Sequence, residues 1–241
     1  MQVRRFYAPR QNFHEGVVSL DEGETRHLRD VLRLRPGDSA HVFDGEGGEF
    51  ECVIEWIEKR TSVVRISGHV EPAAPESTLD LILVAAVLKA DKTDVAVQKA
   101  VELGVNRFIP MITARTDVRL KAASNRVERW RKIVLEASKQ CGRARLMRVD
   151  DLSTFEDHIK NHRTGKLLFF SERDGSELRV TEIPTRITAF LGPEGGWDDA
   201  EIELARRVGA DVVTLHGRIM KADTAAIAIS AILQHKFGDL N

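Results

Sequence analysis

The sequence contains little cysteine: Cys52 and Cys141 are its two cysteines among 241 residues, and they lie far apart. This pattern excludes a disulfide-rich scaffold and a cysteine-ligated metal site, and it is typical of proteins from a reducing compartment. The uninterrupted apolar run from Leu81 to Leu88 is too short to span a bilayer, which needs about 20 residues. The basic first residues are not followed by an apolar stretch, so we predict no secretory signal. We therefore expect a cytoplasmic protein with no membrane partner and no bound metal.

The net charge is also small, because 36 Lys and Arg stand against 37 Asp and Glu. Hydrophobic residues make up 42% of the chain and charged residues 30%, which excludes wholesale disorder. The charge is nevertheless uneven: residues 115–148 contain eleven Lys and Arg but three Asp and Glu, a local charge of +8. A basic segment in an otherwise acidic protein favours a polyanionic partner such as nucleic acid. The alternative is a solvated helix face, since Trp130, Val134 and Ala137 have amphipathic spacing.

The first third of the chain has the pattern of a small β domain. Apolar and polar residues alternate in three stretches, and the glycine-rich residues 45–48 are typical of a hairpin turn. Residues 21–33 have a helical pattern. The polar segment 72–78 contains two prolines and is predicted to be a linker, so the first domain comprises residues 1–71. The predicted strands are residues 40–44, 50–58 and 62–70.

After the linker, residues 79–241 alternate between strand-like and helix-like patterns. Such alternation predicts an α/β domain in which helices flank a parallel sheet. The last helical segment, residues 224–237, is apolar around most of its circumference, so we expect a subunit interface to cover part of it. The predicted strands are residues 79–87, 108–112, 166–170, 187–191 and 211–215, and the predicted helices are residues 92–103, 126–139, a segment near Phe155, 199–208 and 224–237.

Residues 191–199 form the sharpest local motif, between a predicted strand and a predicted helix. In parallel α/β sheets, ligands gather at the carboxyl ends of strands, where the loops diverge. Three glycines let a ligand approach the backbone closely, and Asp198 with Glu201 fits a capping box for the next helix. The motif is neither a Walker loop nor the dinucleotide fingerprint. A tight turn without a ligand is the alternative on spacing alone.

Two further segments combine glycine with polar residues. Residues 215–226 also leave a strand and enter a helix, with Asp223 or Thr224 placed as the N-cap. Residues 140–145 end the basic helix with two arginines, whose guanidinium groups suit phosphate and uracil oxygens. The alternative for this segment is a plain helix C-cap, which needs the glycine and one cation. The loops 191–199 and 215–226 could bind one small ligand together.

These segments resemble a known family, and the resemblance extends over essentially the whole chain. The chain is similar to the bacterial 16S rRNA (uracil-1498) N3-methyltransferases of the SPOUT superfamily. It departs from their usual pattern at His216-Gly217 and at residues 220–224, where Met-Lys-Ala-Asp-Thr replaces Leu-Arg-Thr-Glu-Thr. The matching segments are residues 4–7, 27–33, 43–45, 98–105, 140–143, 191–196 and 215–224.

The resemblance implies an N-terminal PUA-like β-barrel that helps to hold RNA and a C-terminal SPOUT domain with a deep trefoil knot. It also implies a homodimer that binds S-adenosylmethionine in the knot and methylates a uridine of 16S rRNA in the small ribosomal subunit. The implied cofactor site, with its loop neighbours, comprises Phe170, Leu191, Gly192, Pro193, Glu194, Gly195, Gly196, Leu215, His216, Gly217, Ile219, Met220, Thr224 and Ala225.

Methyl transfer to uracil N3 requires loss of the N3 proton, so a carboxylate and a cation are expected beside the reacting base. Our hypothesis assigns charge stabilisation to Arg143 and Arg218, and proton removal to Glu194 or Asp223. Each carboxylate also has a structural alternative, Asp223 as a helix cap and Glu194 as a residue that stabilises its own loop. The predicted RNA-binding residues are Arg4, Arg5, Arg29, Arg33, Arg115, Arg126, Arg143 and Arg145.

Three other functions are open on the sequence alone. One is a SPOUT-type RNA methyltransferase with a different target base, and another is a non-catalytic RNA-binding homologue. The third is an oxidoreductase or other nucleotide enzyme that uses the glycine loop, which would leave the basic helix unexplained. Binding of S-adenosylmethionine, compared with NAD and ATP, separates these functions.

Overall fold

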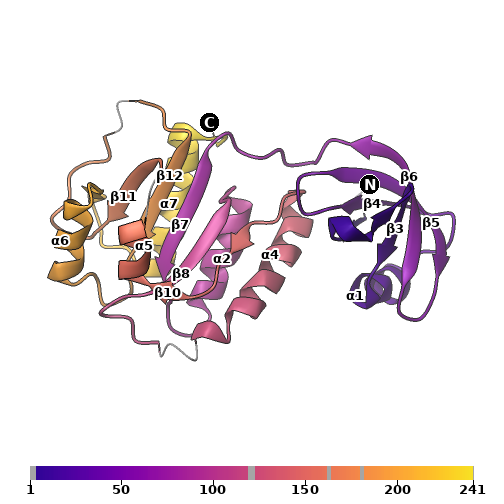
Figure 1. Cartoon of the computed structure of the whole chain (residues 1–241), viewed down its shortest axis with the longest axis horizontal. Helices are drawn as coiled ribbons and strands as arrows, with labels where there is room; N and C mark the ends of the chain where they lie inside the picture. The colour runs from indigo at the N-terminus through magenta and orange to yellow at the C-terminus, as the bar shows by residue number, and fades with distance from the viewer. Residues whose placement is uncertain (1–3, 119–122, 162–163, 180–181, 241) are drawn as a thin grey trace. The chain divides into compact units, whose positions relative to one another are not determined.

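The computed structural model of the chain consists of two compact units (Figure 1). The division between them falls at Glu76 and Ser77, inside the predicted linker, residues 72–78. The N-terminal unit also includes Leu135–Leu146, a segment from the middle of the chain that the sequence pattern did not assign to it. The structure describes residues 4–118, 123–161, 164–179 and 182–240.

A six-stranded sheet forms most of the N-terminal unit, and Figure 1 shows that it curls on itself. Its strand order is β1-β4-β5-β6-β3-β2; β1 and β4 are parallel, and the other pairs are antiparallel. Alternating side chains such as Phe6, Ile54 and Val64 point inward and are buried. The three predicted strands are confirmed as β4, β5 and β6. The strands are β1 (Arg5–Tyr7), β2 (Phe13–His14), β3 (Val17–Leu20), β4 (Ser39–Phe43), β5 (Glu49–Ile57) and β6 (Ser62–Val70), and the helical turns are η1 (Arg10–Asn12), α1 (Glu22–Arg26) and η2 (His27–Val31).

A wholly parallel sheet forms the centre of the C-terminal unit, as the alternation of strands and helices predicted. Its strand order is β10-β8-β7-β12-β11-β13, with β9 paired to β8. The strands are β7 (Asp80–Ala86), β8 (Arg107–Ile112), β9 (Arg148–Val149), β10 (Ser153–Thr154), β11 (Lys166–Phe170), β12 (Arg186–Leu191) and β13 (Asp211–Val213). The helices are α2 (Lys92–Glu102), α4 (Val127–Cys141), α5 (Phe155–Asn161), α6 (Asp199–Arg207) and α7 (Ala222–Phe237).

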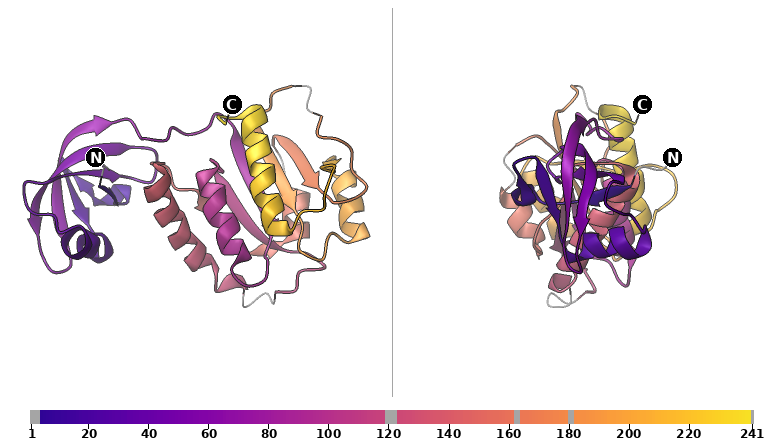
Figure 2. Two further views of the ribbon diagram at one scale, coloured as in Figure 1. Left: turned by 180° about the vertical axis from the view of Figure 1, so that it is seen from behind. Right: turned by 90° about the vertical axis from the view of Figure 1, so that its right-hand side faces the viewer.

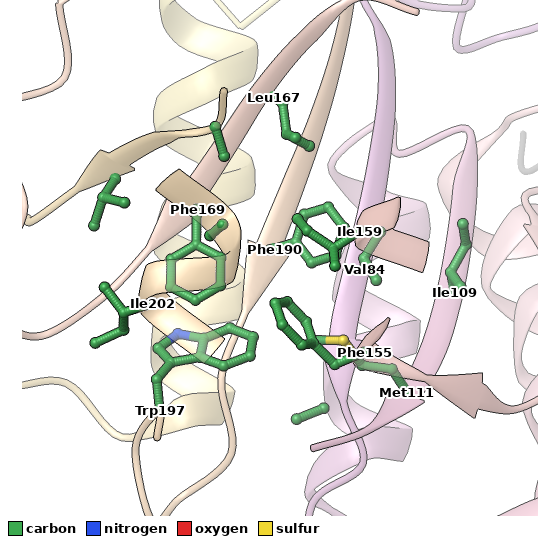
Figure 3. Close-up of a cluster of buried hydrophobic side chains, with 14 residues drawn as sticks. Val84, Ile109, Met111, Phe155, Ile159, Leu167, Phe169, Phe190, Trp197 and Ile202 are labelled. Atoms are coloured by element: carbon green, nitrogen blue, oxygen red, sulfur yellow. The ribbon is translucent and has the colours of Figure 1, made fainter. Parts of the chain in front are cut away.

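Helices cover both faces of this sheet. Figure 2 shows α2 and α7 side by side on one face, and Figure 1 shows α5 and α6 on the other. Between the sheet and α5 and α6 lies an aromatic core in which Trp197, Phe169 and Phe155 contact one another (Figure 3). Both faces of the central strands are therefore buried, which explains the continuous apolar run of β7.

The ends of α6 and α7 differ in how well they were predicted. Asp198 and Glu201 form the predicted capping box at the start of α6. The predicted N-cap of α7 is wrong: the helix begins at Ala222, two residues earlier than expected, and its N-cap is Lys221, without a side-chain hydrogen bond. The side chains of Ile227 and Ile232 in α7 are only partly buried within the chain.

Among the described residues, no helix is long and apolar enough to cross a membrane.

Arg5 joins β1 to the end of α4 inside the N-terminal unit. Its guanidinium makes a bidentate ion pair with Glu49, at 3.0 and 2.8 Å, and the two side chains are 8% and 2% exposed. It also donates to the carbonyl oxygens of Ser138, Lys139 and Arg143 at 2.9–3.1 Å. These carbonyls lie at the end of α4 and just beyond it, where few N–H donors of the helix remain; that of Ser138 also accepts from the Gly142 N–H at 3.1 Å. Arg5 therefore satisfies a helix end and a buried carboxylate at once.

We expect Arg5→Met to lower the free energy of unfolding by about 3–5 kcal/mol, because the buried Glu49 loses its arginine and three carbonyls lose a donor. The matched control is Arg29→Met, which removes an arginine from a more exposed ion pair with Asp30 and should cost much less stability than Arg5→Met. Urea unfolding followed by circular dichroism measures both losses. Equal losses in the two variants would contradict this role of Arg5.

Candidate functional site

A cavity of about 720 Å³ lies at the carboxyl edge of the parallel sheet, within the range typical of cofactor pockets. Three segments line it: residues 170–172 at the end of β11, residues 191–197 at the end of β12, and residues 214–221 after β13. Because β11 pairs in parallel with both β12 and β13, these segments leave the sheet at the same edge. The other lining residues are Lys92 of α2 and Ala222, Ala225 and Ile229 of α7.

Trp197 anchors the glycine loop, residues 192–197, to the sheet. Its indole Nε1 donates to the Phe170 carbonyl at 2.8 Å, and its ring centroid lies 4.2 Å from that of Phe169. Gly192 lies directly against this indole: a Cβ at position 192 would come within 2.9 Å of the ring. The glycine at this position therefore allows the loop to pass over a fixed aromatic side chain.

Glu172 approaches the other end of the glycine loop. Gly196 has a φ of +71°, a left-handed conformation that favours glycine, and a Cβ there would lie 2.6 Å from Glu172 Oε1. The adjacent Arg173 donates to the Trp197 carbonyl at 3.1 Å and to Asp199 Oδ1 at 2.6 Å. The segment after β11 is thus bound to the loop after β12 by side-chain contacts.

Arg115 contacts the start of α6 beside the glycine loop. Its Nη2 lies 3.2 Å from Asp198 Oδ2. The backbone N–H of Ala200 and, to a lesser extent, Arg115 hold the pKa of Asp198 below its ordinary value. The carboxylate therefore stays ionised, which suits a residue that caps a helix N-terminus.

Glu194, a predicted proton acceptor, is already bound to cations and donors of its own chain. Its Oε1 lies 2.9 Å from Lys92 Nζ and 3.4 Å from the backbone N of Lys89. The contact favours the structural alternative for Glu194, which is to stabilise its loop. Lys92 was not predicted as a site residue from the sequence, because no local sequence signal at the start of α2 indicates a contact with a residue 102 positions away.

Arg218 and Asp223 lie in and after the third segment of the cavity. Arg218 lines the cavity and is exposed. Asp223 lies in the first turn of α7, between the lining residues Ala222 and Ala225, and its Oδ1 is buried with no hydrogen-bond partner among the described residues. A carboxylate oxygen in this state carries an unmet requirement for a donor.

The cavity gathers almost all of the predicted cofactor residues. Thr224 is the exception, because it is exposed and does not line the cavity. Whether the lining residues contact a cofactor stays a prediction. The predicted cofactor residues that line the cavity are Phe170, Leu191, Gly192, Pro193, Glu194, Gly195, Gly196, Leu215, His216, Gly217, Ile219, Met220 and Ala225, and the remaining lining residues are Lys92, Ser171, Glu172, Trp197, Thr214, Arg218, Lys221, Ala222 and Ile229.

The predicted RNA-binding arginines fall into two groups. Arg4, Arg33 and Arg145 are exposed, as is Arg115, which also pairs with Asp198. The others already bind their own chain: Arg29 pairs with Asp30, Arg126 donates to backbone carbonyls, and Arg5 is buried.

Arg143 is also buried, and its guanidinium binds both carboxylate oxygens of Glu76 at 3.0 and 2.6 Å. Neither Arg5 nor Arg143 presents its charge at the surface of its unit, and the assignment of these two arginines to RNA stays a prediction. The catalytic assignment of Arg143 stays a prediction. Arg119 and Lys121 of the basic segment lie outside the described residues.

The remaining reactive side chains form no second site in the part of the chain that the structure describes. No group of three or more His, Cys, Asp or Glu side chains is placed there to hold a metal. Both cysteines are free, and burial raises the pKa of the Cys52 thiol to about 12. Such a thiol stays protonated and is a poor nucleophile.

Two family models match the chain. Residues 75–234 match the RNA methyltransferase domain, and residues 20–67 match the RNA methyltransferase PUA domain. The first match alone covers more than half of the sequence, so the chain belongs to the RNA methyltransferase family. The second confirms the predicted PUA-like domain.

Individual relatives give a finer comparison. A Ribosomal RNA small subunit methyltransferase E from Synechocystis is 33% identical over 240 residues, which cover 96% of this chain and 77% of the relative. Its namesake from Rickettsia conorii is 30% identical over 238 residues, covering 96% and 95%. Among solved structures, a Ribosomal RNA small subunit methyltransferase E from Neisseria gonorrhoeae bound to S-adenosyl methionine matches 100% of both chains with a TM-score of 0.90 and 32% identity.

Gly192→Ala should destabilise the protein by about 1–3 kcal/mol, because the new methyl group displaces the buried Trp197 indole from Phe170. The control is Gly68→Ala, a glycine outside the left-handed region whose added Cβ would meet nothing within 4 Å. Thermal unfolding with tryptophan fluorescence detects the loss. A wild-type Tm for Gly192→Ala would show that the loop and the indole are not packed against each other.

Proposed function

We propose that this protein transfers the methyl group of S-adenosylmethionine to N3 of a uridine of the position-1498 type in 16S rRNA of the small ribosomal subunit. One observation carries the proposal: a three-segment cavity lies in a chain that matches, over its full length, a rRNA methyltransferase solved with S-adenosyl methionine bound. The PUA-domain match adds an RNA-binding module in the same chain.

The cavity lining fits this cofactor. Leu215, Met220 and Ile219 offer apolar contact for an adenine ring, and the Ile219 side chain is 86% exposed while it lines the cavity. Ser171 and Glu172 offer oxygen acceptors for hydroxyl and ammonium groups. When bound, the sulfonium supplies an electrophilic methyl group. The task of the protein is then to orient the uracil and to accept its N3 proton.

For proton removal we favour Asp223 over Glu194. Asp223 Oδ1 has no hydrogen-bond partner among the described residues, whereas Glu194 Oε1 accepts from Lys92. For stabilising the charge on the uracil we favour Arg218 over Arg143. Arg218 lines the cavity, whereas Arg143 binds Glu76. In this mechanism Asp223 takes the N3 proton and Arg218 stabilises the negative charge that develops on the uracil oxygens.

We also propose a homodimer, a trefoil knot in the C-terminal domain and a cytoplasmic location. The half-buried Ile227 and Ile232 of α7 support a second copy as the partner of this face. Sedimentation equilibrium tests the dimer, and a monomer mass at micromolar concentration would exclude it. The resemblance to knotted relatives supports the knot, which tracing of an experimental density map tests. The free cysteines support a reducing compartment, which cell fractionation tests.

The test of the function begins with the wild-type protein. Small ribosomal subunits and naked 16S rRNA are incubated with the protein and labelled S-adenosylmethionine, and the methylated base is mapped. We expect one labelled uridine methylated at N3. A labelled methyl group on another base would show that the target differs from the one proposed. Cofactor binding without methylation of RNA would favour a non-catalytic RNA-binding protein. Calorimetric binding of NAD or ATP in place of S-adenosylmethionine would favour the nucleotide enzyme.

Asp223→Asn should lower kcat by roughly 10²–10⁴-fold, the usual contribution of a general base, and leave S-adenosylmethionine affinity nearly unchanged. The amide keeps the shape of the carboxylate but cannot accept the proton. Single-turnover methylation of small subunits measures the rate, and calorimetry measures the affinity. Methylation at the wild-type rate by this variant would remove Asp223 from the mechanism.

Arg33→Ser and Arg145→Ser should each weaken binding to all RNAs alike and reduce the slope of log affinity against log salt by about one. Both side chains are exposed, so their charges are available to phosphates. The comparison variant is Arg29→Ser, whose guanidinium pairs with Asp30 and should change the slope less. Filter binding over a range of salt concentrations measures the slopes. Unchanged slopes for Arg33→Ser and Arg145→Ser would make these arginines ordinary surface charges.

A further inference from the structure

A lysine that no sequence motif marked connects α2 to the glycine loop. Lys92 lines the cavity, and its Nζ lies 2.9 Å from Glu194 Oε1, with the two side chains 35% and 24% exposed. The contact follows from the sheet: β7 pairs with β12 so that Ala85 opposes Leu191. The loop after β7 therefore emerges beside the loop after β12.

The backbone that carries Lys92 is itself held in place. Leu88 donates its N–H to Thr93 Oγ1 at 2.8 Å, and Arg126 donates to the carbonyl oxygens of Leu88 and Ala90 at 3.0 and 2.6 Å. Ala90 has a φ of 53°, a left-handed conformation that these contacts maintain at a residue other than glycine. The ammonium group of Lys92 therefore extends from a fixed turn.

The segment that carries Glu194 is less constrained by its own sequence. Glu194 is followed by Gly195 and Gly196, which lack the side chains that restrict backbone rotation. Beyond them Trp197 is anchored to the sheet, and before them β12 ends at Leu191. The ion pair with Lys92 is thus a side-chain restraint between these two anchors.

We propose that Lys92 is a positioning residue for the cofactor: through Glu194 it holds residues 193–196 in the conformation that binds S-adenosylmethionine. The inference rests on the proposed function, since it concerns the same cavity. It gives Glu194 a structural role and explains why a cation lines a pocket for a cationic sulfonium. The ammonium is neutralised by Glu194 and adds little net charge to the site.

The experiment measures S-adenosylmethionine affinity by calorimetry and KM and kcat by methylation of small subunits. The variants are Lys92→Met, Lys92→Arg, Glu194→Gln and the double variant Lys92→Met with Glu194→Gln. The matched control is Lys99→Met, from the same helix. Lys99 is 39% exposed and pairs with Glu102 at 2.8 Å, but neither residue lines the cavity.

We expect Lys92→Met to weaken S-adenosylmethionine binding and to raise the KM for S-adenosylmethionine, each by about tenfold, equivalent to about 1.4 kcal/mol. The kcat at saturating cofactor should change little. Glu194→Gln should cause a similar loss, and the double variant should be no worse than either single variant, because all three variants lack the same ion pair. Lys92→Arg should retain most of the affinity. Lys99→Met should bind as the wild type does, with a Tm change similar to that of Lys92→Met.

Three outcomes overturn the inference. Equal affinity for Lys92→Met and Lys99→Met would show that the ion pair does not support the loop. Additive losses in the double variant would show that Lys92 contacts the cofactor itself rather than acting through Glu194. A loss of kcat without a change in KM would place Lys92 in the reaction rather than in binding. Failure of the wild type to bind S-adenosylmethionine would instead reject the proposed function, so the two failures are distinguishable.

Discussion

The parallel pairing of β12 between β7 and β11 is the constraint on which the rest of the C-terminal unit depends. It brings the ends of β7, β11 and β12 to one edge of the sheet, and β13 joins them through β11. Segments separated by many residues thereby become the walls of one cavity. The aromatic core under this edge holds Trp197 against Phe169, so the glycine loop starts and ends on rigid supports. The glycine loop is held in place there because the residues on both sides of it are fixed to the sheet.

Charge in this protein serves two different purposes. Arg5 and Arg143 are buried in bidentate pairs with Glu49 and Glu76, where they satisfy carboxylates and a helix end. Arg33 and Arg145 are exposed and retain the charge that a polyanion would meet. A count of basic residues along the chain treats both groups alike. A buried, paired arginine contributes to the stability of the fold, whereas an exposed arginine can attract a polyanion.

The polar side chains around the cavity differ in whether their own chain already uses their hydrogen-bonding capacity. Glu194 binds Lys92 of α2, and Arg173 donates to the carbonyl of Trp197 in the glycine loop. Arg218, in contrast, lies on the cavity lining, and Asp223 has a carboxylate oxygen without a partner among the described residues. A residue whose hydrogen-bonding capacity is already used stabilises the pocket, and one whose capacity is unused can act on a substrate.

The sequence by itself determined the class of the fold, the strands β4 to β6, the parallel α/β unit, the capping box of α6 and the loops that line the cavity. These features depend on local periodicity, on glycine, and on motifs that are continuous along the chain. Only the tertiary structure decided that Lys92 binds Glu194, that Arg5 and Arg143 are buried, and that Leu135–Leu146 packs with the N-terminal unit. It also showed that α7 starts at Ala222, with an N-cap, Lys221, whose side chain makes no capping hydrogen bond. Contacts between residues far apart in sequence depend on which strands become neighbours, and a single sequence carries no local signal of that choice.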